Sequence, residues 1–242
     1  MTRLSVNLNK VALLRNARDL EIPSVTKAAQ TCIDAGAHGI TVHPRPDERH
    51  IRPDDVYALA DLLAEVPLVE YNIEGNPFEG PYMDLVRRVK PAQCTLVPDD
   101  PGARTSDHGW NVEQHAARLR PVVETLQDAG MRVSLFMDPD LEQIEHAARL
   151  GADRIELYTE PYARAYANGS FDAILAQYAQ AAGGAQSMGL GVNAGHDLNR
   201  DNLPAFCALP NILEVSIGHA LIADALQMGL HATVKAYLSC IA

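Results

Sequence analysis

Short apolar runs alternate with longer segments of helical periodicity along the whole chain. The runs are rich in Val, Ile and Leu and are bounded by Gly, Pro, Asp or Asn, which predicts strands. Nearly continuous apolar runs are typical of parallel strands buried on both faces. The predicted strands are RLSVNLN (3–9), GITVHP (39–44), PLVEYNI (67–73), QCTLVPD (93–99), RVSLFMD (132–138), RIELYTE (154–160), LGVNAGH (190–196) and ILEVSIGH (212–219).

The segments between these runs carry helix signals, such as a Ser cap candidate at Ser24 and Gly at several helix ends. The predicted helical segments are 24–37, 52–66, 111–130, 138–152, 171–189 and 220–242. Three of them run through a Gly into the next strand, which is typical of a repeating β/α unit. Eight such units in 242 residues predict a single (β/α)₈ TIM barrel domain over residues 1–242. A doubly wound sheet is disfavoured because no GxGxxG motif follows the first strand. The longest irregular segment, 98–112, is expected to lie over the active face.

Composition narrows the classes of partner. The chain is 47% hydrophobic and 21% charged, as in ordinary globular proteins, and its formal net charge is -11. That charge disfavours nucleic acid as a partner, but local donors can still hold small phosphorylated ligands. No apolar segment approaches the roughly 18 residues of a membrane span, so no membrane association is expected. The four cysteines are widely spaced, which favours reduced thiols, a cytoplasmic location and no zinc site.

Ionisable and amide side chains recur where the predicted strands end. In a (β/α)₈ barrel these ends meet at one mouth, where catalytic groups are found. The strand-end residues are Asn7, Asn9, His43, Glu70, Asp99, Asp138, Glu156, His196, Gly218 and His219. A single His at a strand end is more often structural than catalytic, so the clustering is the stronger signal.

Some of these residues also have a structural interpretation. His43 is followed by Arg45, Arg49 and His50, a mixture that favours an anion site. Glu70 interrupts an apolar strand and must be paired or functional. Glu156 has the same property, although Arg154 could make it purely structural.

The ends of the last two strands, NAGHD and SIGHA, predict a phosphate site. Barrels often bind phosphate with the loops after strands seven and eight and a helix N-terminus. Free backbone N–H groups and the helix dipole favour an anion there. Because such sites are common, this feature by itself names no substrate.

Several distinctive segments follow one another between residues 4 and 238. In chain order they are VNLNKVALLRNAR, GITVHPRPDERHI, LVEYNI, CTLVPD, VSLFMDPD, RIELYT, VNAGHDL and SIGHALI. Together they resemble the pyridoxine 5′-phosphate synthase family of vitamin B6 biosynthesis. The resemblance implies a barrel with additional short helices that assembles as a homo-octamer. It implies condensation of 1-deoxy-D-xylulose 5-phosphate with 3-amino-2-oxopropyl phosphate to pyridoxine 5′-phosphate, phosphate and water, with no metal and no cofactor.

The resemblance also implies roles for individual residues. The proton-transfer groups fall on His43, Glu70 and His196, and an electrostatic stabiliser falls on Glu156. Contacts to the amino-ketone phosphate are implied for Asn7, Arg18, Asp197, Gly218 and His219. Contacts to the deoxyxylulose phosphate are implied for Asn9, Lys10, Arg45, His50 and Thr105. His supplies proton transfer near neutral pH, and a Glu in a low-dielectric mouth can be tuned to do so.

This chain departs from the common family pattern at a few positions. Asn9 and Lys10 stand where the pattern has Asp and His, and Asp197 stands where it has Gly. Tyr158 and Glu160 replace a His and a Gly. The first change removes a negative charge and adds a fixed positive charge, so phosphate binding should persist without proton transfer by this pair.

Three rival functions remain open. The His and Glu residues of the mouth could bind a divalent cation. A Schiff-base aldolase or an epimerase is a second possibility, for which Lys10 is the only strand-end lysine. A non-catalytic binding protein is the third, and it is disfavoured because the proton-transfer set is complete.

Overall fold

The computed structural model describes residues 1–100 and 102–241. Residue 101 of the predicted segment 98–112 and residue 242 of the last predicted helical segment lie outside the described residues.

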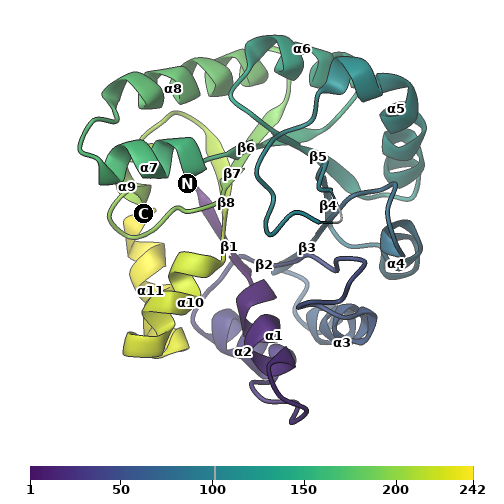
Figure 1. The fold of residues 1–242 in the computed structure, drawn as a ribbon, viewed down its shortest axis with the longest axis vertical. Coiled ribbons are helices and arrows are strands. Elements are labelled where there is room, and N and C mark those ends of the chain that lie inside the picture. Colours follow the sequence, from purple (N-terminus) through teal and green to yellow (C-terminus); the bar gives the residue numbers. More distant parts are fainter. Residues whose placement is uncertain (101, 242) are drawn as a thin grey trace.

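Parallel strands close into a barrel in sequence order, with β8 paired to β1 (Figure 1). The strands are β1 (Arg3–Asn7), β2 (Gly39–Val42), β3 (Glu70–Gly75), β4 (Gln93–Leu96), β5 (Arg132–Met137), β6 (Arg154–Tyr158), β7 (Gly191–Gly195) and β8 (Ile212–Ile217). Every predicted strand is present and the predicted (β/α)₈ barrel is confirmed. The bounds differ most for β3, which begins three residues later than predicted and extends to Gly75.

Helices surround the barrel on its outside (Figure 1). They are α1 (Asn9–Asn16), α2 (Val25–Asp34), α3 (Pro53–Ala64), α4 (Tyr82–Val89), α5 (Val112–Asp128), α6 (Leu141–Leu150), α7 (Glu160–Ala167), α8 (Asp172–Ser187), α9 (Leu203–Cys207), α10 (His219–Met228) and α11 (Leu230–Cys240). The helical segment predicted for 220–242 is two helices, because Gly229 at φ 78° ends α10. Short helices α4 and α9 are the helices of the β3–β4 and β7–β8 connections. Helices α1 and α7 are additional short elements, which precede α2 and α8.

The helix ends follow the local signals in the sequence. Ser24 accepts a hydrogen bond from the N–H of Lys27 at 3.2 Å and caps α2. Gly36, Gly130 and Gly151 lie just after helices with φ of 98°, 86° and 95°, a backbone region that costs glycine little. These glycines turn the chain from each helix into the next strand.

The apolar core lies between the barrel and the helices. The outward side chains of the strands are apolar and buried, for example Ile40, Ile73 and Val215 at 0% exposure. The barrel interior instead holds polar side chains, where (β/α)₈ barrels more often place branched apolar ones. The buried interior polar residues include Ser5, Thr41, Asn72, Gln93, Thr95, Ser134, Asn193 and Glu214. Because the outer face supplies the hydrophobic burial, the interior is available for polar chemistry.

Within the part of the chain that the structure describes, every helix is too short or too polar to cross a membrane.

The end of the β4–α5 loop is fixed against β5. The N–H of Gly109 donates to Asp138 Oδ2 at 3.1 Å, and the Trp110 indole N–H donates to the Leu96 carbonyl at 2.9 Å. A Cβ at Gly109 would lie 2.2 Å from the Asp138 backbone nitrogen, so only glycine fits without a backbone shift.

We therefore expect Gly109→Ala to lower the free energy of unfolding by about 1–3 kcal/mol, as for overpacking. Gly183→Ala is the matched control. A Cβ at Gly183 meets nothing within 4 Å, and alanine should stabilise the interior of α8 by up to about 1 kcal/mol. Urea unfolding of both variants checks this prediction, and equal midpoints would contradict it.

Candidate active site

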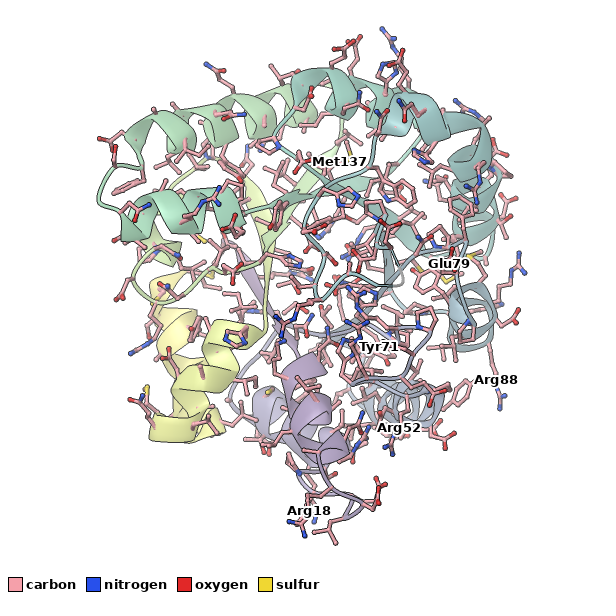
Figure 2. The ribbon with its side chains drawn as sticks, viewed as in Figure 1. Arg18, Arg52, Tyr71, Glu79, Arg88 and Met137 are labelled. Carbon is pink, nitrogen blue, oxygen red and sulfur yellow. The ribbon has the colours of Figure 1, made fainter. Side chains whose placement is uncertain are left out.

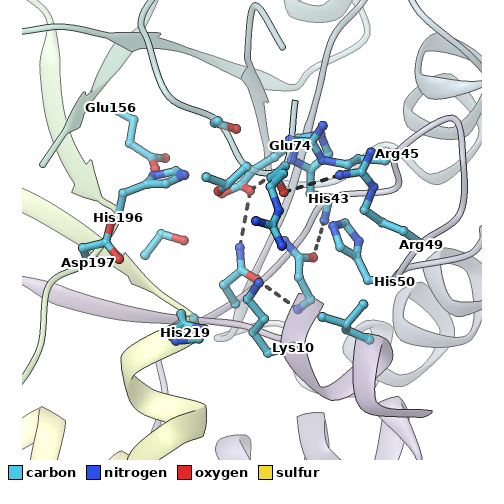
Figure 3. Close-up of a pocket in the computed structure, with 18 residues that line it drawn as sticks. Lys10, His43, Arg45, Arg49, His50, Glu74, Glu156, His196, Asp197 and His219 are labelled. Carbon is cyan, nitrogen blue, oxygen red and sulfur yellow. Dashed lines mark hydrogen bonds and ion pairs between the residues drawn. The ribbon is translucent and has the colours of Figure 1, made fainter. Parts of the chain in front are cut away.

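A cavity of about 360 Å³ opens at the carboxyl ends of the strands (Figure 3). Its lining comes from β1, α1, the β2–α3 loop, β3, the β4–α5 loop, β6 and the ends of β7 and β8. The lining residues are Asn7, Asn9, Lys10, Leu13, His43, Arg45, Arg49, His50, Glu74, Arg104, Thr105, Ser106, Glu156, His196, Asp197, Ser216, Gly218 and His219. All of the predicted site residues are in this set except Glu70 and Arg18.

The prediction that Glu70 lies at the mouth is wrong. Glu70 is the first residue of β3 and is at the opposite end of the barrel, where it forms ion pairs with Arg3 at 2.7 Å and with Arg132. The apolar residues before it are not in the strand, and Leu68 is 91% exposed. Glu70 is therefore a half-buried, paired carboxylate of the barrel base.

Glu74 occupies the position that was expected for Glu70. Side chains of a strand alternate, so Glu70 and Glu74 share the inward face, roughly 13 Å apart along β3 at 3.3 Å per residue. The alternation Glu70-Tyr71-Asn72-Ile73-Glu74 carries this information in the sequence. The apolar run before Glu70 obscures this alternation, because the run predicts a strand that begins at Pro67.

Arg18 also lies outside the cavity. It is exposed on the segment between α1 and α2, at an extremity of the molecule (Figure 2). The neighbouring Arg15 is buried instead. Arg15 donates to Asp55 Oδ2 at 2.9 Å and to the His50 carbonyl at 3.2 Å, which fixes the end of the loop that carries His43.

The first strand is connected to the second through amide side chains. Asn7 Oδ1 accepts from the N–H of Asn9 at 3.0 Å, and Asn9 Oδ1 accepts from the N–H of His43 at 2.9 Å. An amide oxygen accepts the hydrogen bond from the His43 N–H as well as a carboxylate oxygen does. This explains how the chain can carry Asn9 where the common pattern has Asp.

His43 is buried between two carboxyl groups. Its Nδ1 lies 3.8 Å from Glu74 Oε2 and its Nε2 lies 3.8 Å from Asp99 Oδ2. Burial and the nearby Arg45 lower the pKa of His43 well below its ordinary value, so the ring is neutral near pH 7. Burial and the neighbouring Asp99 raise the pKa of Glu74 to about 8. A neutral imidazole and a carboxyl group that is largely protonated near neutral pH thus lie side by side.

One side of the cavity is cationic, with Lys10, Arg45, Arg49 and Arg104 in its lining (Figure 3). His50 lies among them, and its Nδ1 accepts from the N–H of Ile51 at 2.9 Å. This leaves Nε2 as the N–H donor of the neutral ring. Burial, followed by Arg45, lowers the pKa of His50 to about 4. The cations and the neutral donor together suit a phosphate group.

His196 lies on the other side of the cavity, beside Glu156 and Asp197 (Figure 3). Its backbone has φ 86°, and its ring packs against Phe136 and Tyr158 at centroid distances of 4.9 and 5.5 Å. Burial lowers its pKa to about 4, and its Nδ1 has no hydrogen-bond partner among the described residues. An unpaired, buried nitrogen in a strained backbone is typical of a functional group.

Glu156 is 1% exposed and projects into the barrel interior. Its Oε2 has no hydrogen-bond partner within the described chain, and burial with Glu74 raises its pKa well above the ordinary value. Arg154 does not pair with it but donates to Asn193 Oδ1 at 3.1 Å. Gly195 is required beside this carboxyl, since a Cβ there would lie 2.6 Å from Glu156 Oε1.

At the end of β8, where a phosphate site is predicted, a helix N-terminus lies beside the cavity. Gly218 precedes α10, which begins at His219, and both residues line the cavity. A Cβ at Gly218 would lie 3.1 Å from Asn7 Cβ, so glycine lets the helix N-terminus approach β1. Helix N-termini favour anions.

The described residues contain no group of three or more His, Cys, Asp or Glu side chains arranged to hold a metal ion.

These features define a class: a (β/α)₈ barrel with a polar cavity at the carboxyl ends of its strands, where enzymes of this fold have their active sites. The sequence profile of the family described as pyridoxal phosphate biosynthesis protein PdxJ matches residues 4–242. The chain belongs to this family, whose members include the enzyme pyridoxine 5′-phosphate synthase.

Curated relatives support the assignment along the full length. A pyridoxine 5′-phosphate synthase of Albidiferax ferrireducens is 59% identical, with 100% of this chain and 98% of the relative covered. One of Xanthomonas campestris is 55% identical, covering 100% of this chain and 96% of the relative.

Solved structures at low identity show the fold alone. A 3-keto-L-gulonate-6-phosphate decarboxylase from Vibrio cholerae superposes with a TM-score of 0.67 at 11% identity, covering 99% of this chain and 97% of that chain. A thiamine phosphate pyrophosphorylase from Pyrococcus furiosus gives 0.63 at 12% identity, covering 99% and 95%.

A matched pair of variants should distinguish the roles of the two carboxyl groups of β3. Glu70→Gln removes ion pairs at the barrel base and should lower the free energy of unfolding by about 1–2 kcal/mol while kcat stays within about threefold of wild type. Glu74→Gln should reduce kcat by about 10²-fold or more while the fold is retained. Steady-state kinetics and urea unfolding of both variants make the comparison, and a large loss of kcat in Glu70→Gln would restore it to the mechanism.

The pH dependence of the free energy of unfolding gives a second test of the same two variants. The folded chain holds a proton on Glu74 up to a pKa of about 8, whereas the ordinary pKa of a Glu side chain, as in the unfolded chain, is 4.5. Between these pH values the folded state therefore binds more protons. Stability contributed by this group is therefore lost as pH rises through that window. Glu74→Gln should reduce the slope, and Glu70→Gln should leave it in place.

Proposed function

We propose that the chain condenses 1-deoxy-D-xylulose 5-phosphate with 3-amino-2-oxopropyl phosphate to give pyridoxine 5′-phosphate, phosphate and water. The observation that supports this best is the pairing, in one cavity, of a cationic side with three proton-transfer groups, His43, Glu74 and His196. The two substrates carry two phosphates and need several proton transfers. Membership of the family adds the reaction type.

Binding is assigned to the two ends of the cavity. The deoxyxylulose phosphate is bound by Arg45, His50 and Thr105 with Asn9 and Lys10, all of which line the cavity. The phosphate of the amino ketone is bound at the N-terminus of α10 by Asn7, Asp197, Gly218 and His219. Arg18, which lies outside the cavity, has no part in this assignment.

The chemistry proceeds by general acid–base catalysis. The amine attacks the ketone, and the imine forms with loss of one water. Loss of phosphate, carbon–carbon ring closure and loss of a second water follow, each with a proton transfer. His43 accepts protons, and Glu74 takes the place of Glu70 as its partner: Glu74 is the acid while it is neutral and an acceptor once it has given up its proton. The pKa of His196 is about 4 in the empty cavity, and a phosphate dianion beside it favours the protonated form, which then donates to a leaving oxygen.

Positive charge that develops on the imine nitrogen favours ionisation of the buried Glu156, and the carboxylate then stabilises that charge. Its unpaired Oε2 is available for this purpose. The steps form and break C–N, C–C and C–O bonds with proton transfers and need no external oxidant or reductant, so we propose that neither a metal nor a cofactor takes part.

We further propose that the chain works in the cytoplasm as a homo-octamer. The cysteines are free thiols, as is usual in a reducing compartment. Apolar side chains on α1 and the segment after it are exposed and would be covered by another copy: Leu13 at 41%, Leu14 at 54%, Leu20 at 55% and Ile22 at 64%.

The activity is tested with EDTA-treated protein and both substrates, by following phosphate release and the fluorescent pyridine product together. Product formation without added metal is the expected result. His196→Ala should keep substrate binding and lose about 10²-fold or more in kcat. Near-normal kcat would remove His196 from the mechanism, and no product from folded wild type with metal restored would overturn the proposal.

The same preparations test the rivals. Product formation only after a divalent cation is restored would favour the metal barrel. Borohydride trapping of either substrate on wild type, lost in Lys10→Arg, would favour Schiff-base chemistry at Lys10.

Light scattering tests the assembly. The expected mass is eight times the 26.3 kDa of one chain. Leu20→Asp should reduce this mass, whereas Leu68→Asp, at a 91% exposed position outside the proposed interface, should not. A wild-type monomer would contradict the octamer.

A further inference from the structure

Asp99 is a buried carboxylate behind the cavity wall. It follows β4, is 5% exposed and does not belong to the cavity lining. Its Oδ2 accepts from the Arg45 guanidinium and from Ser106 Oγ at 2.9 Å. Its Oδ1 is buried with no hydrogen-bond partner among the described residues. Burying an oxygen that forms no hydrogen bond is unfavourable, so stability alone does not account for it.

Asp99 contacts two groups that the proposed function uses. Arg45 also donates to the Ala103 carbonyl at 3.2 Å, so Asp99 and the β4–α5 loop together fix the guanidinium at the edge of the cavity. On the other side, Asp99 Oδ2 faces His43 Nε2 at 3.8 Å. His43 Nδ1 faces Glu74 at the same distance. The ring therefore lies in line between two carboxyl groups.

The surrounding charges decide which carboxyl is ionised. Asp99 has a guanidinium partner in Arg45, whereas Glu74 forms no ion pair with Lys or Arg among the described residues and accepts only a 3.4 Å hydrogen bond from Asn7. Two like charges on either side of one ring disfavour each other, so the unpaired group holds the proton. Glu74 is then the neutral acid and Asp99 the anion.

This asymmetry sets the tautomer of His43. An anion opposite Nε2 favours N–H at that atom, and a neutral acid opposite Nδ1 can donate to its lone pair. Nδ1 is then the atom that receives a proton from Glu74, and the imidazolium that forms is stabilised by Asp99.

We propose that Asp99 is a positioning residue: it holds His43 with N–H at Nε2 and holds Arg45 at the phosphate end of the cavity. It touches no substrate and acts through these two side chains. The inference rests on the proposed function, because that function makes His43 a proton-transfer group and Arg45 a phosphate ligand.

The first measurement needs no variant and no turnover. In the wild-type protein, ¹⁵N-labelled histidine spectra, with the His43 signals assigned by their loss in His43→Gln, should show N–H at Nε2. Nδ1–H in the wild type would overturn the proposal.

Asp99→Asn and Asp99→Glu, with Asp100→Asn as the matched control, test the consequences. Asp99→Asn places an amide opposite Nε2, so His43 should shift toward Nδ1–H and kcat should fall about 10²- to 10⁴-fold, the scale of a misplaced tautomer. KM for deoxyxylulose phosphate should rise because Arg45 is released. Asp99→Glu keeps the charge and should restore part of kcat and the Nε2–H tautomer. Asp100→Asn makes the same charge change at the exposed neighbouring residue, which is outside the cavity lining, and should stay within about threefold of wild type.

The outcomes separate the two proposals. If wild type makes no pyridoxine 5′-phosphate but His43 still changes tautomer in Asp99→Asn, the synthase function fails and the positioning of His43 stands. If wild type is active and folded Asp99→Asn keeps both kcat and the Nε2–H tautomer, Asp99 has no positioning role.

Discussion

The burial of carboxyl groups inside a closed barrel is the constraint on which the rest of this structure depends. Glu74, Glu156 and Glu214 are each at most 5% exposed, and burial raises the pKa of all three. A charged carboxylate without a partner is too unfavourable in such an interior, so these groups stay protonated or are hydrogen-bonded. The polar interior supplies such bonds lower in the barrel, where Gln93 and Asn193 donate to Glu214 Oε1 at 3.4 and 3.3 Å. The apolar core is accordingly outside the barrel.

Distance from the arginines distinguishes structural from chemical carboxyls. At the base, Arg3 and Arg132 pair with Glu70, and these contacts lower its pKa despite the raising effect of burial. At the mouth, Arg45 pairs with Asp99 but leaves Glu74 with no cation of its own. Glu74 keeps a pKa of about 8, near the range in which a group can both accept and donate a proton. Glu70 and Glu74 thus have different functions on the same strand, because the two ends of β3 lie in different electrostatic fields.

The mouth also contains strain and unpaired atoms that the rest of the fold supports. His196 and Asp197 have φ of 86° and 57°, values that bulky residues seldom adopt. The Thr159 hydroxyl donates to the His196 carbonyl at 2.5 Å, and Asn202 donates to the Asp197 carbonyl at 3.2 Å. These bonds fix a backbone that would otherwise relax. Gly195 before them has no side chain, which leaves room for Glu156.

Local signals in the sequence are sufficient to predict the barrel, because apolar periodicity, helix caps and glycine joints agree along the chain. They also predict most residues of the mouth, because His43, Glu156, His196 and the end of β8 follow from where the strands end. The first residue of β3 was not determined locally: PLVEYNI is equally apolar before and after Glu70, and only pairing with β2, Gly39 opposite Glu70, sets the start. The alignment of Asp99, His43 and Glu74 joins three different strand ends, and only the closed barrel brings them together.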